Sequence, residues 1–358
     1  MESIRIQNTA YIHIRYVDGG YRVTGTPTYL RGRVLNDAAK DQCGLDGLFV
    51  KWRWDGQRLE VISSPYGFAP VYYYATPTEI CVSTSILSIL DCGAPRELDR
   101  PALALFLRLG FYVGTDTPFA HIKAIPRSGS LTWSACTSVR ADNSRLDPAP
   151  APIRRDEAIE KYASLFSEAM RRLAPRSDDF AVPLSGGRDS RHILLELLRQ
   201  GFQPKFCLTT QRTPPIGNED IRIASELTKA LHLKHIVVEW PKWRLRYDEL
   251  TNQMTSFCTD EEACFMPLLP PLEQVQEVYD GIAGGVLSAG DYLDPDALRS
   301  FQDGRLEEAA KRIMDFWHHE TSWFRTALSS SILKACPYSL AMERLVQELR
   351  EFSLSHNL

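Results

Sequence analysis

Short apolar runs separated by turn signals fill residues 1–147 of the chain. The clearest example is Phe49–Trp54, which is followed by Asp55-Gly56 and then by Arg58–Ile62. Two such runs joined by an Asp-Gly turn predict a β-hairpin. Further strands are expected at Val71–Tyr74, Ile80–Ser83 and Gly129–Trp133. A helix is expected at Arg100–Leu109, because proline occupies its first turn. This part of the chain is therefore predicted to be mainly β.

In the second part of the chain, apolar residues recur every three or four positions with charged residues between them. This spacing predicts an amphipathic helix that carries Ile159, Tyr162, Phe166, Met170 and Leu173 on one face. The elements expected after it are a strand at Phe180–Leu184, a helix at Ser190–Arg199, a strand at Phe206–Leu208, a helix between Asn218 and Leu231, and a strand at His235–Trp240. Strands that alternate with helices through short connections predict a parallel, doubly wound sheet.

The clearest boundary in the sequence is Asp147–Pro152, where proline occupies every second position from Pro148 onwards. Proline fixes φ near about −65° and favours an extended, semi-rigid segment, as a linker requires. We therefore expect two domains, residues 1–147 and residues 148–358. The predicted fold class is α/β, with a mainly-β first domain and a second domain built on a doubly wound parallel sheet.

The composition is that of a folded globular protein, with 44% hydrophobic and 24% charged residues. The net charge of −4 argues against nucleic acid as the main partner. No apolar run approaches the roughly 18–20 residues that span a bilayer, and Met1–Arg5 lacks the layout of a signal peptide. These features predict a cytoplasmic protein that binds neither nucleic acid nor membrane. The eight cysteines contain no Cys-x-x-Cys pair, so they offer no zinc-ligand spacing.

The segment that carries recognisable chemistry is Pro183–Arg191, with the sequence PLSGGRDSR, between a predicted strand and a predicted helix. Glycine lets the backbone fold closely round an anion, serine adds hydroxyl donors, and a helix N-terminus adds positive partial charge. An aspartate in this setting suggests a magnesium ion between its carboxylate and phosphate. A glycine-rich turn capped by serine is the simpler alternative, but the position between strand and helix favours a phosphate loop. The candidate pyrophosphate-binding residues are Ser185, Gly186, Gly187, Asp189 and Ser190, with Asp189 as the candidate metal ligand.

Ser185–Ser190 resembles the pyrophosphate loop of N-type ATP pyrophosphatases, and its surroundings resemble the asparagine synthetase family. Leu45–Phe49 and Tyr66–Tyr73 are similar to parts of that family's glutaminase domain. The resemblance implies a glutaminase-like domain of the Ntn type at residues 1–147 and an ATP-pyrophosphatase domain at residues 148–358. β-Lactam synthetases and lasso-peptide cyclases share this plan. It also implies ATP and Mg²⁺ as cofactors, with Leu208 and Thr209 in the region that contacts adenine.

Two positions depart from a working glutaminase domain. Such a domain begins with a cysteine nucleophile, whereas Met1 is followed here by Glu2. The family's oxyanion-loop motif corresponds to Arg31–Asn36, in which Arg31 takes the place of an asparagine donor. Because nucleophile and donor are both replaced, we expect no glutamine hydrolysis.

The second domain departs from the family as well. Asp280–Gly290 resembles the loop that completes the metal site, but Gly285 replaces the metal-binding aspartate and Ile282 replaces a catalytic glutamate. Asp280 or Asp291 could substitute as a ligand.

The C-terminal part also resembles the family only in part. Cys336–Leu340 resembles the start of a helix in the family, and the chain ends at Leu358. The sequence therefore stops before the region in which relatives carry a lysine that stabilises the transition state.

Two functional hypotheses follow from these matches and departures. The first is an ATP-dependent, AMP-forming amide ligase that joins a small-molecule or peptide carboxylate to ammonia or an amine. The second is a catalytically impaired paralogue that binds nucleotide and acts as a partner or scaffold. The intact loop favours the first, whereas Gly285 and Ile282 favour the second. Association as a homodimer, or with a protein partner, stays open.

Overall fold

The computed structural model describes residues 9–35, 47–64, 67–127, 129–134, 140–143, 152–211, 217–240, 245–259, 263–282, 284, 294–327 and 329–356. The chain forms two compact units. The first comprises Met1–Asp147, Asn252–Glu261 and Leu293–Leu358, and the second comprises Pro148–Thr251 and Glu262–Tyr292. The sequence division assigns everything after residue 147 to one domain. In the structure, by contrast, the C-terminal segment groups with the N-terminal residues, and much of the expected linker lies outside the described residues.

The first unit contains two five-stranded antiparallel sheets. One sheet has the order β2 (Gly20–Gly25), β1 (Tyr11–Val17), β7 (Glu79–Ser83), β6 (Tyr72–Thr76), β8 (Lys123–Ala124). The other has the order β10 (Arg140–Asn143), β9 (Gly129–Trp133), β5 (Leu59–Ser63), β4 (Gly47–Trp54), β3 (Thr28–Val34). The core between the sheets takes inward-facing residues from both, including Ile12, Trp52, Val61, Val82 and Trp133. The two antiparallel sheets confirm the mainly-β character that the sequence predicts for this part of the chain.

The predicted hairpin around Asp55-Gly56 is present as β4 and β5. Oδ1 of Asp55 accepts hydrogen bonds from the N–H groups of Gln57 at 2.8 Å and Arg58 at 2.7 Å. Gly56 has a φ of +105°, a conformation that side chains other than glycine rarely adopt. The turn therefore forms for the reason that its sequence suggests.

Helices complete the first unit. α1 (Ile86–Asp91) packs on β6 and β7, where Ile86 and Ile89 are fully buried. α2 (Arg100–Leu109) packs against two helices of the C-terminal segment, α10 (Leu306–Ala327) and α12 (Tyr338–His356). The other helices of that segment are α9 (Pro295–Gln302) and α11 (Ser330–Ala335). Leu105, Leu109, Met314 and Leu345 share one core cluster. Burial of each such side chain stabilises by about 1.5–3 kcal/mol, which explains why the C-terminal helices group with the first unit.

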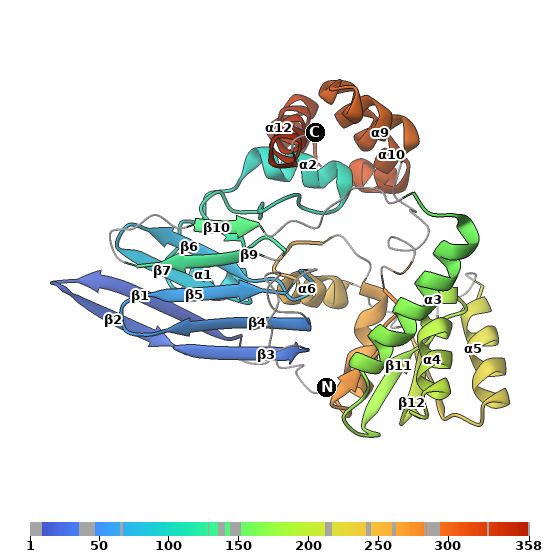
Figure 1. Ribbon diagram of the computed structural model, residues 1–358. Coiled ribbons are helices and arrows are strands. Elements are labelled where there is room, and N and C mark those ends of the chain that lie inside the picture. The colour runs from blue at the N-terminus through green and yellow to red at the C-terminus, as the bar shows by residue number, and fades with distance from the viewer. Residues whose placement is uncertain are drawn as a thin grey trace. The chain divides into compact units, whose positions relative to one another are not determined.

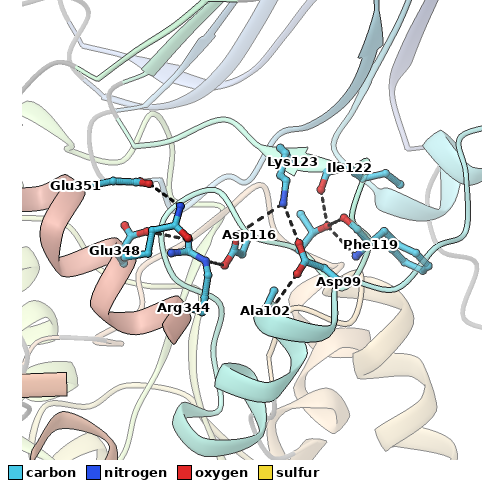
Figure 2. Close-up of polar contacts among 11 residues, drawn as sticks. Asp99, Ala102, Asp116, Phe119, Ile122, Lys123, Arg344, Glu348 and Glu351 are labelled. Atoms are coloured by element: carbon cyan, nitrogen blue, oxygen red, sulfur yellow. Dashed lines mark hydrogen bonds and ion pairs between the residues drawn. The ribbon is translucent and has the colours of Figure 1, made fainter. Parts of the chain in front are cut away.

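A chain of charged side chains links α12 to the segment between α2 and β8 (Figure 2). Nζ of Lys123 lies 3.0 Å from Oδ2 of Asp99 and 3.7 Å from Oδ1 of Asp116. Arg344 donates from Nε to Oδ2 of Asp116 at 2.7 Å and from Nη2 to Glu348 at 2.8 Å. Burial alone would lower the pKa of Arg344, but its bonds to these carboxylates outweigh burial and raise it. Nη1 of Arg344 is buried without a hydrogen-bond partner among the described residues.

The second unit contains a four-stranded parallel sheet with the order β13 (His235–Glu239), β12 (Phe206–Gln211), β11 (Phe180–Pro183), β14 (Glu277–Val278). Its helices are α3 (Arg155–Arg172), α4 (Arg188–Arg199), α5 (Glu219–Ala230), α6 (Leu245–Met254), η1 (Ala263–Leu268) and α7 (Leu269–Leu272). The last residues of α6, from Asn252 onwards, are grouped with the first unit. Figure 1 shows α4 and α5 beside β11 and β12. Of these elements, α3, β11, α4, β12, α5 and β13 lie where the sequence predicts them, whereas α6, η1, α7 and β14 were not predicted.

Both faces of the parallel sheet are covered. Val182 and Cys207 face a cluster formed with α3, α4 and α5, whereas Ala181 and Phe206 face a cluster that includes Leu268 of η1. Because of this alternation along β11 and β12, Phe180–Val182 and Phe206–Thr209 are all buried, as expected for a parallel sheet covered on both sides. Among the described residues, no helix combines the length and apolarity needed to cross a membrane.

Candidate phosphate-binding site

The segment between β11 and α4 follows the carboxyl end of β11, the strand at which the strand order of the parallel sheet reverses. Numbered along the chain, the four strands β11 to β14 are arranged 3-2-1-4, so β12 and β14 flank β11 on opposite sides. In open α/β sheets, ligands bind outside the carboxyl ends of the strands at such a reversal. The topology therefore places residues 184–187 where this kind of sheet binds its ligands.

Two serine hydroxyls close the loop. Oγ of Ser190 accepts the N–H of Ser185 at 3.1 Å, and Oγ of Ser185 accepts the N–H of Gly187 at 3.1 Å. The two oxygens lie 3.2 Å apart, so one hydroxyl donates its hydrogen to the other. The pair has two hydroxyl hydrogens and uses one of them internally. The second hydrogen is available to an anion bound at the loop.

The start of α4 adds further donors. Gly187 is the N-cap residue, and no side chain caps the helix there. The first amide groups of a helix have no partner within the helix and carry positive partial charge, so this end of α4 favours an anion. Nε of Arg191 donates to the carbonyl oxygen of Gly187 at 2.9 Å, which holds a cationic side chain over the same turn.

Gly186 lies close to the start of α5. The sequence suggests that this glycine lets phosphate approach the backbone. In the structure, a Cβ at Gly186 would lie 2.9 Å from Oδ1 of Asp220 and 2.9 Å from Cδ1 of Ile223. The N–H of Gly186 donates to the same Asp220 oxygen at 2.7 Å. A side chain at position 186 would crowd the start of α5, so the packing favours glycine, and the approach of phosphate to this backbone stays a prediction.

Asp189, the candidate metal ligand, lies exposed in the first turn of α4. The loop after β14 packs against this turn: a Cβ at Gly281 would lie 2.6 Å from the backbone nitrogen of Ser190, and one at Gly284 would overlap the side chain of Asp189. Ile282 is exposed, and Gly285 and Asp291 lie outside the described residues. The described residues contain no group of three or more histidine, cysteine or acidic side chains that could hold a metal ion.

Asp280 immediately precedes the glycine that contacts α4. Burial raises the pKa of its carboxyl group, although the N–H groups of Ile282 and Gly281 lower it in part. The Ile282 N–H donates to Oδ1 at 3.2 Å. Asp280 as a whole residue is nevertheless exposed, and an accessible carboxyl group with a raised pKa beside the loop is a candidate functional residue. Two residues could substitute as metal ligands, Asp280 and Asp291. Of these, Asp280 lies within the described residues.

The side chains of Leu208 and Thr209 are engaged within the sheet. Leu208 is fully buried, and its carbonyl oxygen accepts the N–H of Leu184 at 2.8 Å. Oγ1 of Thr209 donates its only hydrogen to the carbonyl oxygen of Leu184 at 2.6 Å. Contact of these residues with adenine stays a prediction, and it would involve the backbone.

A histidine of β13, which the sequence does not single out as a functional residue, completes this contact. Nε2 of His235 lies 2.9 Å from Oγ1 of Thr209 and must be the donor, because the Thr209 hydrogen is already used. Nδ1 of His235 then accepts from Oγ of Ser225 at 3.3 Å. Burial lowers the pKa of His235, which favours this neutral tautomer. The contacts tie β13 and β12 to the residue that begins the loop.

The two positions at which the sequence departs from a working glutaminase domain belong to the first unit. Arg31 is an exposed residue of β3. Gly32, beside it, has a φ of +97°, and a Cβ there would overlap the carbonyl group of Leu48. Glu2 lies outside the described residues. Close packing with β4 therefore explains the glycine of this motif. The interpretation of Arg31 as a replaced oxyanion donor rests on the resemblance alone.

Comparison with known proteins gives one similarity of note. No protein-family model matches the chain. The chain is 22% identical over 199 residues to asparagine synthetase [glutamine-hydrolyzing] 1 of Bacillus subtilis (strain 168). The matched stretch covers 52% of this chain and 30% of that protein, so the chain spans less than a third of its relative. The similarity supports a distant relation to asparagine synthetases.

Proposed function

We propose that the protein is an ATP-dependent, AMP-forming ligase that makes amide bonds. The observation that carries the proposal is the Ser185–Ser190 loop, with a spare hydroxyl hydrogen and an uncapped helix start, at the strand-order reversal of a parallel sheet. A phosphate group is the ligand that such a loop and helix N-terminus suit best. The similarity to an asparagine synthetase supports a ligase over other nucleotide-binding proteins.

The proposed reaction has two steps. A carboxylate oxygen of the substrate bonds to the α-phosphorus of ATP, and the bond to pyrophosphate breaks. The nitrogen of ammonia or of an amine then attacks the acyl carbon, AMP leaves with the bonding electrons, and the nitrogen loses a proton to a base. The remaining hydroxyl hydrogen of the Ser185–Ser190 pair and the first amide groups of α4 would bind the departing pyrophosphate and stabilise its charge, which lowers the barrier of the first step.

Magnesium fits this site as part of a nucleotide complex. Asp189 supplies one exposed carboxylate at the first turn of α4. Magnesium sites commonly combine one or two protein carboxylates with substrate phosphates and water. A single carboxylate holds the free ion weakly, so we propose that Mg²⁺ arrives bound to ATP. The cofactors are accordingly ATP and Mg²⁺.

We further propose that ammonia or a substrate amine, and not glutamine, supplies the nitrogen. Arg31 stands where the resemblance has an asparagine that donates to an oxyanion, and removal of such a donor costs about 10²–10³ in rate. Incubation of the protein with glutamine should release no glutamate above a no-enzyme control. Release that is abolished by Arg31→Ala would contradict this part of the proposal.

Exchange of labelled pyrophosphate into ATP, measured across a panel of carboxylic acids and peptides, tests the ligase activity. Exchange that depends on one acid supports the proposal and identifies the substrate. Ser185→Ala should abolish the exchange, whereas Ser167→Ala, on α3, should leave it unchanged. Tight binding of Mg-ATP without exchange for any acid would favour the nucleotide-binding paralogue. Absence of both Mg-ATP binding and pyrophosphate exchange would contradict the assignment of Ser185–Ser190 as a phosphate loop.

A further inference from the structure

Asp220 is a charged residue in direct contact with the candidate phosphate loop, yet it does not belong to the loop motif. It lies in the first turn of α5, and its Oδ1 accepts the N–H of Gly186 at 2.7 Å. A hydrogen bond from an amide to an ionised carboxylate is shorter and stronger than a neutral one. The contact joins two segments that are 34 residues apart in the sequence.

Close packing supports the same contact independently of the hydrogen bond. A Cβ at Gly186 would lie 3.3 Å from Cα of Asp220 and 2.9 Å from Cδ1 of Ile223. The peptide group of Gly186 is therefore held between an acceptor and an apolar side chain of the same helix turn. Because β11 and β12 are neighbours, the segments that follow them meet at the carboxyl edge of the sheet.

We propose that Asp220 is a positioning residue for phosphate binding, which acts through the peptide group of Gly186. This inference rests on the proposed function of the loop. With the Gly186 N–H bound to Asp220, the peptide group between Ser185 and Gly186 is held in one orientation, directly before the turn in which the Gly187 N–H binds Oγ of Ser185 and α4 begins. Preorganised donors bind a ligand more tightly than donors that must be ordered on binding.

The acceptor oxygen, and not the negative charge, carries this role. The Asp220 carboxylate lies beside a site that binds an anion, so its charge opposes phosphate while its oxygen orders the loop. Asp220→Asn keeps an oxygen acceptor and removes the charge. Asp220→Ala removes both. The two variants therefore separate positioning from electrostatics.

Amide hydrogen exchange in the ligand-free protein tests the contact without reference to nucleotide. Protein labelled with ¹⁵N at glycine reports on Gly186 directly. Asp220→Ala should accelerate exchange of the Gly186 amide on the order of tenfold, as expected when a hydrogen bond to a charged acceptor is lost. Glu219→Ala is the matched control, because Glu219 lies in the same helix turn and bonds to Arg222 instead of the loop. Unchanged exchange in Asp220→Ala would overturn the inference.

Calorimetric binding of magnesium pyrophosphate and Mg-ATP tests the consequence. Asp220→Ala should weaken both on the order of tenfold, whereas Asp220→Asn and Glu219→Ala should stay within about threefold of the native protein. Equal losses in Asp220→Ala and Asp220→Asn would contradict a role for the acceptor oxygen. Thermal unfolding of each variant shows whether a loss of affinity reflects unfolding.

The two measurements also keep the inference apart from the proposed function. Suppose that the native protein binds neither ligand but Asp220→Ala accelerates amide exchange at Gly186. The proposed function then fails, and the hydrogen bond from Gly186 to Asp220 orders the loop without a role in phosphate binding. If the native protein binds Mg-ATP and Asp220→Ala binds it equally well, the proposed function stands and Asp220 is not a positioning residue.

Discussion

The two compact units use their polar side chains in opposite ways. In the first unit, Asp116 lies between Lys123 and Arg344, and the charges neutralise one another along a chain that ends at α12 (Figure 2). In the second unit, the Ser185–Ser190 loop satisfies only part of its donors internally. Charged groups that neutralise one another hold elements together, whereas an exposed loop with a spare donor can bind a ligand. The comparison predicts that substitutions in the first cluster lower stability and that substitutions in the second lower affinity.

The largest effect is expected from Asp116→Ala. The Asp116 side chain is 7% exposed and that of Arg344 is 13% exposed, so the substitution leaves a largely buried guanidinium without its nearest counter-charge. Loss of one partner from a buried pair costs about 3–5 kcal/mol. Urea unfolding should show this loss in the free energy of unfolding, while Mg-ATP affinity of the folded variant should be unchanged.

Two comparisons sharpen that result. Asp296→Ala breaks the exposed pair with Arg299 and should cost less than about 1 kcal/mol. The double variant Asp116→Leu/Arg344→Met removes both charges and should recover part of the stability lost by Asp116→Ala. A loss in Asp116→Ala no greater than in Asp296→Ala would show that the cluster does not hold α12.

Asp189→Asn should have the next largest effect, on affinity. It removes the candidate magnesium ligand from the start of α4, and loss of a charge-assisted contact costs on the order of 1–3 kcal/mol, or about tenfold to a hundredfold in affinity. The exposed carboxylate makes no hydrogen bond to another described residue, so thermal stability should change little. Asp179→Asn, at the opposite end of β11, is the control. Equal Mg-ATP affinity in native protein and Asp189→Asn would remove Asp189 from the site.

Gly281→Ala should have a smaller effect on affinity than Asp189→Asn, because its cost is shared between stability and affinity. The new Cβ would lie 2.6 Å from the Ser190 nitrogen and 2.9 Å from its Cα, and these backbone atoms cannot move aside without shifting α4 or the loop after β14. Overpacking of this kind costs about 1–3 kcal/mol. Gly217→Ala is the control, because nothing lies within 4 Å of its Cβ position. If both alanine variants melt and bind pyrophosphate alike, the loop after β14 does not support the site.

Local sequence signals predicted much of the fold. The strand at Gly129–Trp133 and the helix at Arg100–Leu109 have the predicted boundaries, because apolar alternation, proline and turn residues act locally. β3 was not predicted, since most of its side chains are exposed and show no apolar alternation. The grouping of α10 and α12 with α2 could not be predicted either, because any apolar helix face is compatible with several partners.

The candidate site shows the same division between local and long-range information. The sequence singles out Ser185–Ser190 because glycine, serine and aspartate fall between a strand and a helix. The contacts of Asp220 and Gly281 with that loop depend on the order of β11, β12 and β14 in the sheet, which no local pattern encodes. Their sequence signal was limited to an acidic residue in a first helix turn and a glycine after a strand. Sequence therefore identified the loop but not the residues that hold it.

The smallest effect concerns His235 and appears as a pH dependence. Burial lowers the pKa of His235 in the folded protein below the value of 6.5 that applies to an exposed histidine. The unfolded chain therefore binds more protons at this residue than the folded protein does, so the free energy of unfolding falls as pH decreases through 6.5. His235→Gln keeps a donor for Thr209 and removes the titration. The stability advantage of the native protein over His235→Gln should therefore shrink between pH 7.5 and pH 5.5. Urea unfolding of both proteins at the two pH values measures this, and the other histidines cancel in the difference. An advantage that grows at low pH would mean that the protonated ring is the stabilised form, in which Nδ1 donates to Oγ of Ser225 and Nε2 still donates to Oγ1 of Thr209.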